Sequence, residues 1–518
     1  MKICLIRPPL VRRTKLSLTA VFLPIGLAYL AGYLRKADVE VALVDAYGEA
    51  IEWVSAIDVD GLKSIMRQGL TDSEIVARIP PDSDVIGISS MYSADWPVVR
   101  QVIRAIRQQF PTTWLIAGGE HVTVLPEFCL RDAPELDFIV LGEGERTTVS
   151  LLRALNAGSG ELPSISGLAW LDQEQFVTTG APKRIRNLGE LAKPAWDLFP
   201  VSQYFRQDNL SAAVTSEQAK TLPIIASRGC PYACAFCPSV NIWGRLWVVR
   251  DPEEVIDEIE SYIRDYGVTT FDFYDQAGII RKSWIIKFCH LLLERKLPIT
   301  WNIPAGTRLE ALNQEVIKLL KDSRCGYFGF PLESGSERSL KLVNKQLNKQ
   351  KALQKLRWII DARLKTKIHF VIGFPDETLR DVLASYRVAI LAGWLGAQDA
   401  SFYPFYPIPG STFFDRLLKD GHIEINDKFF ITLTSYENMS EVKSYCNHIG
   451  NRTLGWLCFL GMALFYGVSF LRRPQRAWSL IREIYTRESE SRLGLYFVRT
   501  LKSKNRRFID VGQKNQPI

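Results

Sequence analysis

The chain has 518 residues, 47% of them hydrophobic and 23% charged, and this balance excludes a disordered, collagen-like or multi-span membrane protein. Its length predicts two or three domains. The formal charge of +8 lies at the end of the chain, since residues 472–518 hold twelve Lys or Arg against four Asp or Glu. A basic tail on a neutral body indicates an anionic partner surface, unless the tail is a solvated terminal helix.

The nine cysteines are dispersed and odd in number, which argues against a secreted disulfide scaffold. The first apolar run precedes the basic residues near the N-terminus, which is the reverse of a signal peptide. We therefore expect a cytoplasmic protein.

Residues 1–155 predict a doubly wound, flavodoxin-like α/β domain. Short apolar runs alternate with amphipathic stretches, as in a parallel sheet covered on both faces. The expected strands are 3–6, 39–44, 84–89, 114–117 and 138–141, with helices such as 24–35, 96–109 and 145–155 between them. Ligands of such sheets bind beyond the carboxyl ends of the strands. Those ends carry residues that either admit a ligand to the backbone or only form turns, namely Pro8-Pro9, Ser89-Ser90, Gly118-Gly119 and Gly142.

Residues 156–220 lack a regular period and are expected to be a linker with one hairpin near 168–177. A second βα series occupies residues 221–420. Its expected strands are 223–226, 270–274, 299–302, 327–332, 368–372 and 401–406, with helices such as 252–266 and 378–392. Six βα units in series predict a partial (β/α)6 barrel of the TIM type, whose chemistry lies at the carboxyl ends of its strands.

The region 421–518 has a helical pattern. It contains nineteen consecutive uncharged residues, Thr453–Leu471, which is the lower limit of membrane-spanning length. A span would export the basic tail of a cytosolic protein, against the positive-inside tendency. We therefore expect either a helix buried in the protein or a helix that lies in the membrane interface.

Three cysteines lie on one short loop directly after the first expected barrel strand. Cys230, Cys234 and Cys237 have the spacing C-x3-C-x2-C. Thiolates ligate iron–sulfur clusters, and three of them leave one iron of a [4Fe-4S] cubane open to another ligand. Structural zinc needs four closed ligands, and no fourth Cys or His lies near the loop in sequence. We therefore predict that these three cysteines are the metal ligands of a catalytic cluster.

The triad, with Phe236 before its last cysteine, resembles the signature of the radical S-adenosylmethionine (SAM) superfamily. In that superfamily the open iron binds SAM, which is cleaved reductively to a 5′-deoxyadenosyl radical. The resemblance covers residues 223–420. It implies SAM contacts at Phe236, Gln276, Glu333, Ser334, Arg338 and Gly373. Gln276 departs from the paired acidic motif of the family, and Glu337 and Glu377 alternatively favour helix N-termini.

The N-terminal domain resembles the cobalamin-binding domain that often precedes this core. The matching segments are 24–30, 117–121, 141–145 and the linker segment 194–200. The resemblance implies cobalamin contacts at Ser90, Gly118, Gly119, His121, Gly142 and Glu143. The D-x-H-x-x-G motif of many such domains is incomplete here, because His121 lacks the aspartate and the glycine. We therefore predict no His ligand to cobalt, and His121 either contacts the corrin edge or is a hydrogen-bonded turn residue.

The order of the two domains resembles the subgroup that contains the anaerobic magnesium-protoporphyrin monomethyl ester cyclase and the hopanoid-modifying enzymes. It implies a cobalamin-dependent methyltransferase that acts on an unactivated carbon of a hydrophobic, lipid-like or natural-product substrate, through a 5′-deoxyadenosyl radical and methylcobalamin. An oxidative cyclase or ring-rearranging enzyme with the same cofactors is the alternative. A tRNA methylthiotransferase is disfavoured, because that family has three cysteines near its N-terminus and only Cys4 and Cys129 precede the triad here.

The partners follow from the same resemblance. A flavodoxin- or ferredoxin-type protein is expected to supply the low-potential electron, and no nucleic acid is expected. The aromatic segment Tyr403–Gly410 closes the barrel and either lines an apolar substrate pocket or packs in the core. With the apolar helix and the basic tail, this segment favours peripheral contact with the inner face of a membrane.

Overall fold

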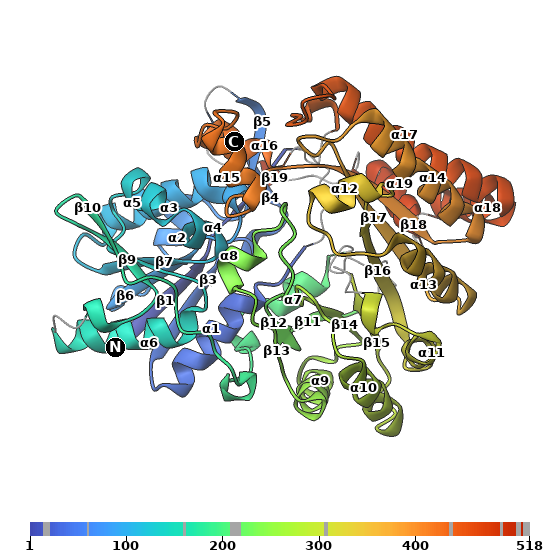
Figure 1. Ribbon diagram of the computed structural model, residues 1–518. Coiled ribbons are helices and arrows are strands. Elements are labelled where there is room, and N and C mark those ends of the chain that lie inside the picture. The colour runs from blue at the N-terminus through green and yellow to red at the C-terminus, as the bar shows by residue number, and fades with distance from the viewer. Residues whose placement is uncertain are drawn as a thin grey trace, which may run out of the picture.

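The computed structural model describes residues 1–13, 21–59, 62–158, 162–207, 219–304, 309–434, 439–486, 491–503 and 509–510. Two α/β bodies lie side by side, and the last helices pack on the outer side of the second body (Figure 1). Most of the basic tail beyond Ser503, and parts of the expected linker, lie outside the described residues.

The first body is built on a seven-stranded sheet of order β10-β9-β8-β7-β6-β1-β3. Its parallel strands are β1 (Lys2–Arg7), β3 (Glu40–Asp45), β6 (Val85–Ser89), β7 (Trp114–Gly118) and β8 (Phe138–Val140). The spatial order β3-β1-β6-β7-β8 is the flavodoxin order, so the expected doubly wound fold is confirmed. The expected hairpin forms β9 (Leu168–Asp172) and β10 (Gln175–Thr178), which extend this sheet in antiparallel fashion.

Helices cover both faces of the first sheet, because its strands are apolar on both sides. Alternate strand residues such as Leu5 pack with α1 (Ile25–Lys36) and α6 (Gly144–Ala157), while Ile6 and its counterparts pack with α3 (Trp96–Gln109) and α5 (Pro126–Asp132). The short helices α2 (Asp72–Val76), α4 (Glu120–Val124) and α7 (Val201–Phe205) complete this part of the chain.

A small sheet that the sequence analysis did not predict lies beside the first body. It has the order β19-β4-β5-β2 and consists of β2 (Leu10–Arg12), β4 (Trp53–Val59), β5 (Leu62–Gln68) and β19 (Ile509–Asp510). The pair β4–β5 is an antiparallel hairpin. The backbone of β19 pairs in parallel with β4, so residues 509–510 lie beside a strand of the first 60 residues.

The second body is the expected partial barrel. Six parallel strands stand in chain order: β11 (Thr221–Ile224), β14 (Thr270–Phe273), β15 (Thr300–Ile303), β16 (Cys325–Glu333), β17 (Thr366–Ile372) and β18 (Asp399–Pro404). The helices between them are α9 (Pro252–Tyr266), α10 (Lys282–Glu294), α11 (Gln314–Asp322), α12 (Glu337–Leu342), α13 (Lys349–Asp361) and α14 (Leu379–Leu395). A short ribbon, β12 (Ser227–Arg228) with β13 (Val248–Val249), and α8 (Ser239–Trp243) follow the first strand.

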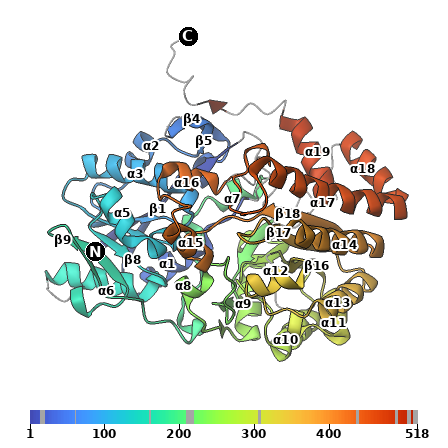
Figure 2. The ribbon, with the colours of Figure 1, turned by 45° about the horizontal axis from the view of Figure 1, so that its top comes forward.

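The C-terminal region divides between the two bodies. Helices α15 (Thr412–Lys419) and α16 (Asp427–Thr432) turn back to the first body, where Asp427 accepts a hydrogen bond from Arg100. Helices α17 (Asn451–Arg472), α18 (Pro474–Thr486) and α19 (Arg492–Ser503) lie together at one end of the molecule (Figure 2).

Helix α17 contains the apolar run and is, in the described part of the chain, the one helix long and apolar enough to cross a membrane. It packs against the barrel instead: a Cβ on Gly461 would lie 2.7 Å from the ring of Phe402, and the carbonyl of Leu457 accepts a hydrogen bond from Tyr386. One face of α17 is therefore fixed to the protein.

Candidate active site between the two bodies

The three predicted cluster ligands lie on the loop that follows β12. Cys230, Cys234 and Cys237 are partly exposed and form no disulfide, and the amide of Cys237 donates to the carbonyl of Cys234 (3.0 Å). Among the described residues no three Cys, His, Asp or Glu side chains are arranged to hold one metal ion. A cubane takes each thiolate on a different iron, so its three ligands stand wider apart than the ligands of one ion. Three thiolates with no fourth Cys or His near them in sequence fit a cluster with one open iron, whereas structural zinc needs four protein ligands.

The protein holds the ends of this loop from two sides. The side-chain carbonyl of Gln276 accepts from the amide of Gly229 (2.9 Å), and the carboxylate of Asp275 accepts from Ser227 Oγ (2.5 Å). Burial raises the pKa of Asp275 to about 6. Gly229 has φ +88°, and a Cβ there would lie 2.2 Å from the carbonyl oxygen of Leu246. The position therefore requires glycine, and Gln276 orients the loop that carries the cysteines.

The middle of the loop is fixed by its backbone. The amide of Ala235 donates to the carbonyl of Val343 (2.9 Å), and its carbonyl accepts from the amide of Phe413 (2.9 Å). Phe236 contacts Phe374, whose ring also meets Phe405 and Phe413. The aromatic segment after β18 thus contributes Phe405 to core packing, one of its two expected roles.

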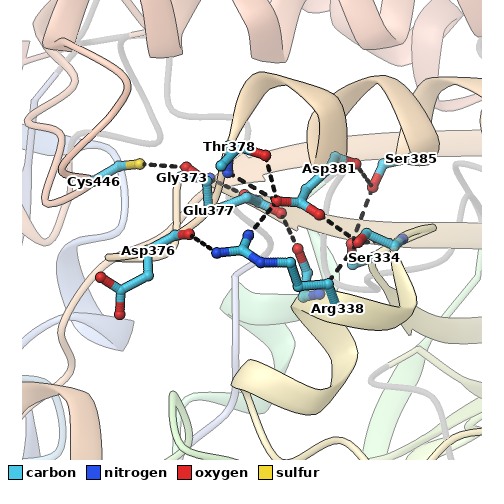
Figure 3. A network of polar contacts seen from close by, with 11 residues as sticks. Ser334, Arg338, Gly373, Asp376, Glu377, Thr378, Asp381, Ser385 and Cys446 are labelled. Carbon is cyan, nitrogen blue, oxygen red and sulfur yellow. Dashed lines mark hydrogen bonds and ion pairs between the residues drawn. The ribbon is translucent and has the colours of Figure 1, made fainter.

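The predicted SAM-binding segments after β16 and β17 form one polar network (Figure 3). Arg338 donates to Asp381 (2.6 Å) and to the carbonyl of Asp376 (2.9 Å). Ser334 lies within 3.2 Å of Ser385 Oγ, which accepts from the amide of Gly335 (2.9 Å). Ser334 and Arg338 therefore join the two segments to each other, and contact of either residue with SAM remains a prediction.

Glu377 is the buried centre of this network. Its carboxylate accepts from the amide of Gly373 (2.6 Å) and from Ser339 Oγ (2.9 Å), and burial raises its pKa to about 7. Gly373 has φ +86°, and a Cβ there would lie 2.7 Å from the side chain of Leu454 on α17. The loop after β17 is thus closed between Glu377 and α17.

Glu333 ends β16 with φ +64°, a conformation that residues with a Cβ seldom adopt. Its carboxylate accepts from Lys345 Nζ (2.9 Å), and both side chains are buried. Such backbone geometry is held by its surroundings and concentrates at functional sites. Lys345 was not predicted as a site residue, because a single lysine at this position belongs to no recognisable sequence motif.

The inner wall of the barrel at β17 and β18 is polar. The register pairs Lys367 with Asp399 and His369 with Ser401 on one face of the sheet. The other face packs outward, since Phe402 contacts Tyr386 of α14. Lys367 Nζ donates to the hydroxyl of Tyr403 (3.1 Å) on the inner face.

The first body presents its topological switch point at the carboxyl ends of β1 and β6. Ser90, directly after β6, is fully buried, and its hydroxyl has no hydrogen-bond partner among the described residues. Tyr92, two residues further on, is 48% exposed. Met91 is also exposed there. An unsatisfied hydroxyl beside exposed apolar side chains fits a large, amide-rich ligand such as cobalamin.

The predicted glycines shape this edge. Gly119 has φ +118°, and a Cβ there would lie 2.4 Å from the carbonyl oxygen of Ser90. The carbonyl of Gly118 accepts from the amide of Ser90 (2.7 Å), and the amide of Gly142 donates to Thr123 Oγ1 (2.9 Å). The three glycines bring the loops after β6, β7 and β8 together.

His121 lies in the core and not at the edge. Its Nδ1 is 2.9 Å from Ser93 Oγ and its Nε2 is 3.4 Å from Cys129 Sγ, and its ring packs between Trp96 and Phe430. Burial lowers its pKa to about 3. His121 is thus a hydrogen-bonded core residue in this structure, and the absence of a His ligand to cobalt stays a prediction.

Glu143 joins the first body to the cluster loop. Its carboxylate accepts from Arg184 Nε (2.7 Å) and from Arg228 (3.2 Å), while Arg228 also donates to Glu145 (2.7 Å). Burial alone would lower the pKa of Arg228, but the two carboxylates raise it. Arg228 stands two residues before Cys230, so this buried ion-pair network links the loop after β8, where cobalamin contacts are predicted, directly to the predicted cluster ligands. The carboxylate of Glu143 is therefore already paired with two arginines, and its contact with cobalamin stays a prediction.

A second buried network was also missed by the sequence analysis. Tyr204 Oη donates to Asp45 (2.6 Å) and accepts from Arg7, whose other nitrogen donates to the carbonyl of Phe22 (2.7 Å). These residues close the carboxyl ends of β1 and β3 against α7. The sequence feature that could have pointed to this network is Arg7, which directly precedes Pro8-Pro9.

Comparison with known proteins agrees with this two-body arrangement. Residues 15–152 match the B12 binding domain, and residues 224–389 match the Radical SAM superfamily. An uncharacterized methyltransferase of Pyrococcus horikoshii is 30% identical over 414 residues, which cover 79% of this chain and 82% of that protein. The anaerobic magnesium-protoporphyrin IX monomethyl ester cyclase of Cereibacter sphaeroides is 27% identical, covering 76% of this chain and 60% of the cyclase.

One solved structure shows the same fold over most of the chain. The cobalamin-dependent SAM radical enzyme OxsB, solved with aqua-cobalamin and SAM bound, superposes with a TM-score of 0.61 at 18% identity. The match covers 81% of this chain and 55% of OxsB.

Proposed function

Since this chain belongs to the cobalamin-dependent radical SAM enzymes, we propose that it is a methyltransferase whose acceptor is an unactivated carbon of a hydrophobic substrate. Its cofactors are a [4Fe-4S] cluster, SAM and cobalamin. When bound, they supply a 5′-deoxyadenosyl radical and a methyl group. The observation that carries the proposal is the ion-pair network of Arg228 with Glu143 and Glu145, which supports a reaction shared between the cluster loop and the cobalamin edge.

The residues of this chain hold and orient the cofactors. Cys230, Cys234 and Cys237 would ligate the cluster, and Gln276 would fix the direction of their loop through Gly229. The edge formed by Ser90, Met91 and Tyr92 would hold cobalamin. The network around Glu377 would keep the two SAM segments in register and exclude water from beneath them.

The chemistry of the walls supports a substrate that has both an apolar and a polar part. Met91 and Tyr92 offer apolar surface at the cobalamin edge, whereas Lys367, His369 and Tyr403 offer polar groups on the inner face of the barrel. A lipid-like or natural-product molecule with a polar group would satisfy both walls. A flavodoxin or ferredoxin would supply the electron, and nucleic acid would take no part in the reaction. The enzyme would act in the cytoplasm, in peripheral contact with a membrane.

The products decide between methyl transfer and its alternative. The protein, purified anaerobically and reconstituted with iron, sulfide and cobalamin, is incubated with SAM, reductant and lipid extract. Methyl transfer predicts S-adenosylhomocysteine and 5′-deoxyadenosine together, because one SAM gives the methyl group and a second gives the radical. Formation of 5′-deoxyadenosine without S-adenosylhomocysteine would instead indicate the oxidative cyclisation suggested by the cyclase relative.

A further inference from the structure

The solvent-facing side of α17 is apolar from Trp456 to Leu471, between a polar first turn and Arg472 at its end. Its exposed side chains recur at helical spacing and include Trp456 (71% exposed), Phe459, Leu460 and Leu471 (85% exposed). No charged residue occurs from Thr453 to Leu471. An ordinary surface helix turns charged residues to solvent, so this helix lacks the polar face that water requires.

Helix α18 also exposes apolar side chains. Trp478, Ile481 and Tyr485 are exposed at positions i, i+3 and i+7, which places them along one side of the helix. At the C-terminal end of α17, the guanidinium of Arg472 lies 5.2 Å from the ring centre of the exposed Trp394 on α14. We call these side chains the docking face; its members are Trp394, Trp456, Phe459, Leu460, Leu471, Trp478, Ile481 and Tyr485.

The segment that carries most of the docking face has charges of one sign. Residues 442–482 contain no Asp or Glu and six Lys or Arg. Glu483, which follows, is buried and accepts from Ser491 Oγ (2.8 Å), so its charge is turned inward. Exposed Trp, Tyr and Phe side chains with arginines at their border match the headgroup region of an anionic bilayer.

We propose that the docking face lies in the headgroup layer of an anionic membrane. Helix α17 would lie flat in this layer, because its opposite face is packed on β18 and α14 and cannot be surrounded by lipid. A helix of 22 residues extends about 33 Å, so the contact runs along the side of the barrel. Its first turn reaches the loop after β17, where Leu454 lies against Gly373. The membrane would therefore lie beside the mouth of the barrel, where an apolar substrate could enter from lipid.

This inference rests on the proposed function for its purpose, but its test needs no turnover. The full-length protein is floated with vesicles of phosphatidylcholine alone and with vesicles of equal parts phosphatidylcholine and phosphatidylglycerol. We expect binding to the anionic vesicles that weakens as salt is added. The variant Trp456→Ser/Phe459→Ser removes two exposed rings without opening the core and should bind at least about tenfold more weakly. Leu293→Ser, which removes an exposed apolar side chain on α10, is the matched control and should bind as the wild type does.

Three results would overturn the proposal. The first is absence of binding to anionic vesicles. The second is equal binding by the wild type and by Trp456→Ser/Phe459→Ser. The third is a wild-type dimer without vesicles that the same variant converts to a monomer, since the docking face would then cover a second copy of the chain. A protein that binds vesicles and forms no S-adenosylhomocysteine would leave the membrane contact standing while refuting methyl transfer.

Discussion

Removing the positive charge of Arg228 is expected to destabilise the contact between the two bodies strongly. The network contains Arg184 and Arg228 against Glu143 and Glu145, so its formal charges cancel. The variant Arg228→Met leaves one buried carboxylate unpaired. Breaking a buried ion pair on one side costs about 3–5 kcal/mol, whereas a neutral replacement of the whole pair costs little.

The thermal midpoint measures this cost. One kcal/mol corresponds to about 2–4 °C for a domain of 150–250 residues, so Arg228→Met should lower the midpoint by roughly 6 °C or more. The double variant Arg228→Met/Glu145→Gln keeps only Arg184 and Glu143 and restores neutrality. It should therefore be more stable than Arg228→Met alone, which is a non-additivity that neighbouring sites permit.

The cluster provides a second measurement on the same variants. Arg228 is two residues from Cys230, so Arg228→Met should also retain less iron after reconstitution. A midpoint within 1 °C of the wild type, or additive effects of the two substitutions, would refute the view that these charges are buried and coupled.

Three further outcomes are expected. Alanine at Cys230, Cys234 or Cys237 should abolish SAM cleavage and most bound iron, and wild-type turnover by any of the three would contradict the cluster assignment. Burial raises the pKa of Glu377 from 4.5 to about 7, so only the folded state holds this proton in that interval. As the pH rises from 4.5 to about 7, the free energy of unfolding should therefore fall by up to about 1.4 kcal/mol per pH unit. Glu377→Gln should remove this dependence of the thermal midpoint on pH. Ser90→Ala removes an unsatisfied buried hydroxyl and should stabilise the cobalamin-free protein while lowering cobalamin retention; loss of stability without loss of cobalamin would disprove the ligand role.

Much of the fold was predictable because each buried strand is a local apolar run. The expected runs in residues 1–155 and 221–420 correspond to β1, β3, β6, β7 and β8 and to all six barrel strands. The pair β4–β5 was missed although its residues alternate and Asp60-Gly61 stands between the strands, which is a hairpin signal. These strands form a separate small sheet, so their half-exposed pattern resembles a loop when only continuous apolar runs are sought.

Some parts of the site depend on residues that are close in sequence, and other parts depend on residues that are far apart in sequence. The cysteine loop was predictable because its three ligands lie within eight residues. The partners of that loop were not, because Gln276 meets Gly229 across 47 residues and Glu143 meets Arg228 across 85. Sequence spacing cannot show which acidic side chain pairs with which arginine.

The packing of α16 on the first body has a consequence for how the chain is made. Arg100 pairs with Asp427, which lies 327 residues later, and the ring of His121 is covered by Phe430. When the first 155 residues leave the ribosome, neither partner has yet been synthesised, so that segment emerges with part of its hydrophobic surface uncovered. The first body is therefore expected to need protection by chaperones until α16 arrives, whereas a self-contained domain would finish folding as it is made.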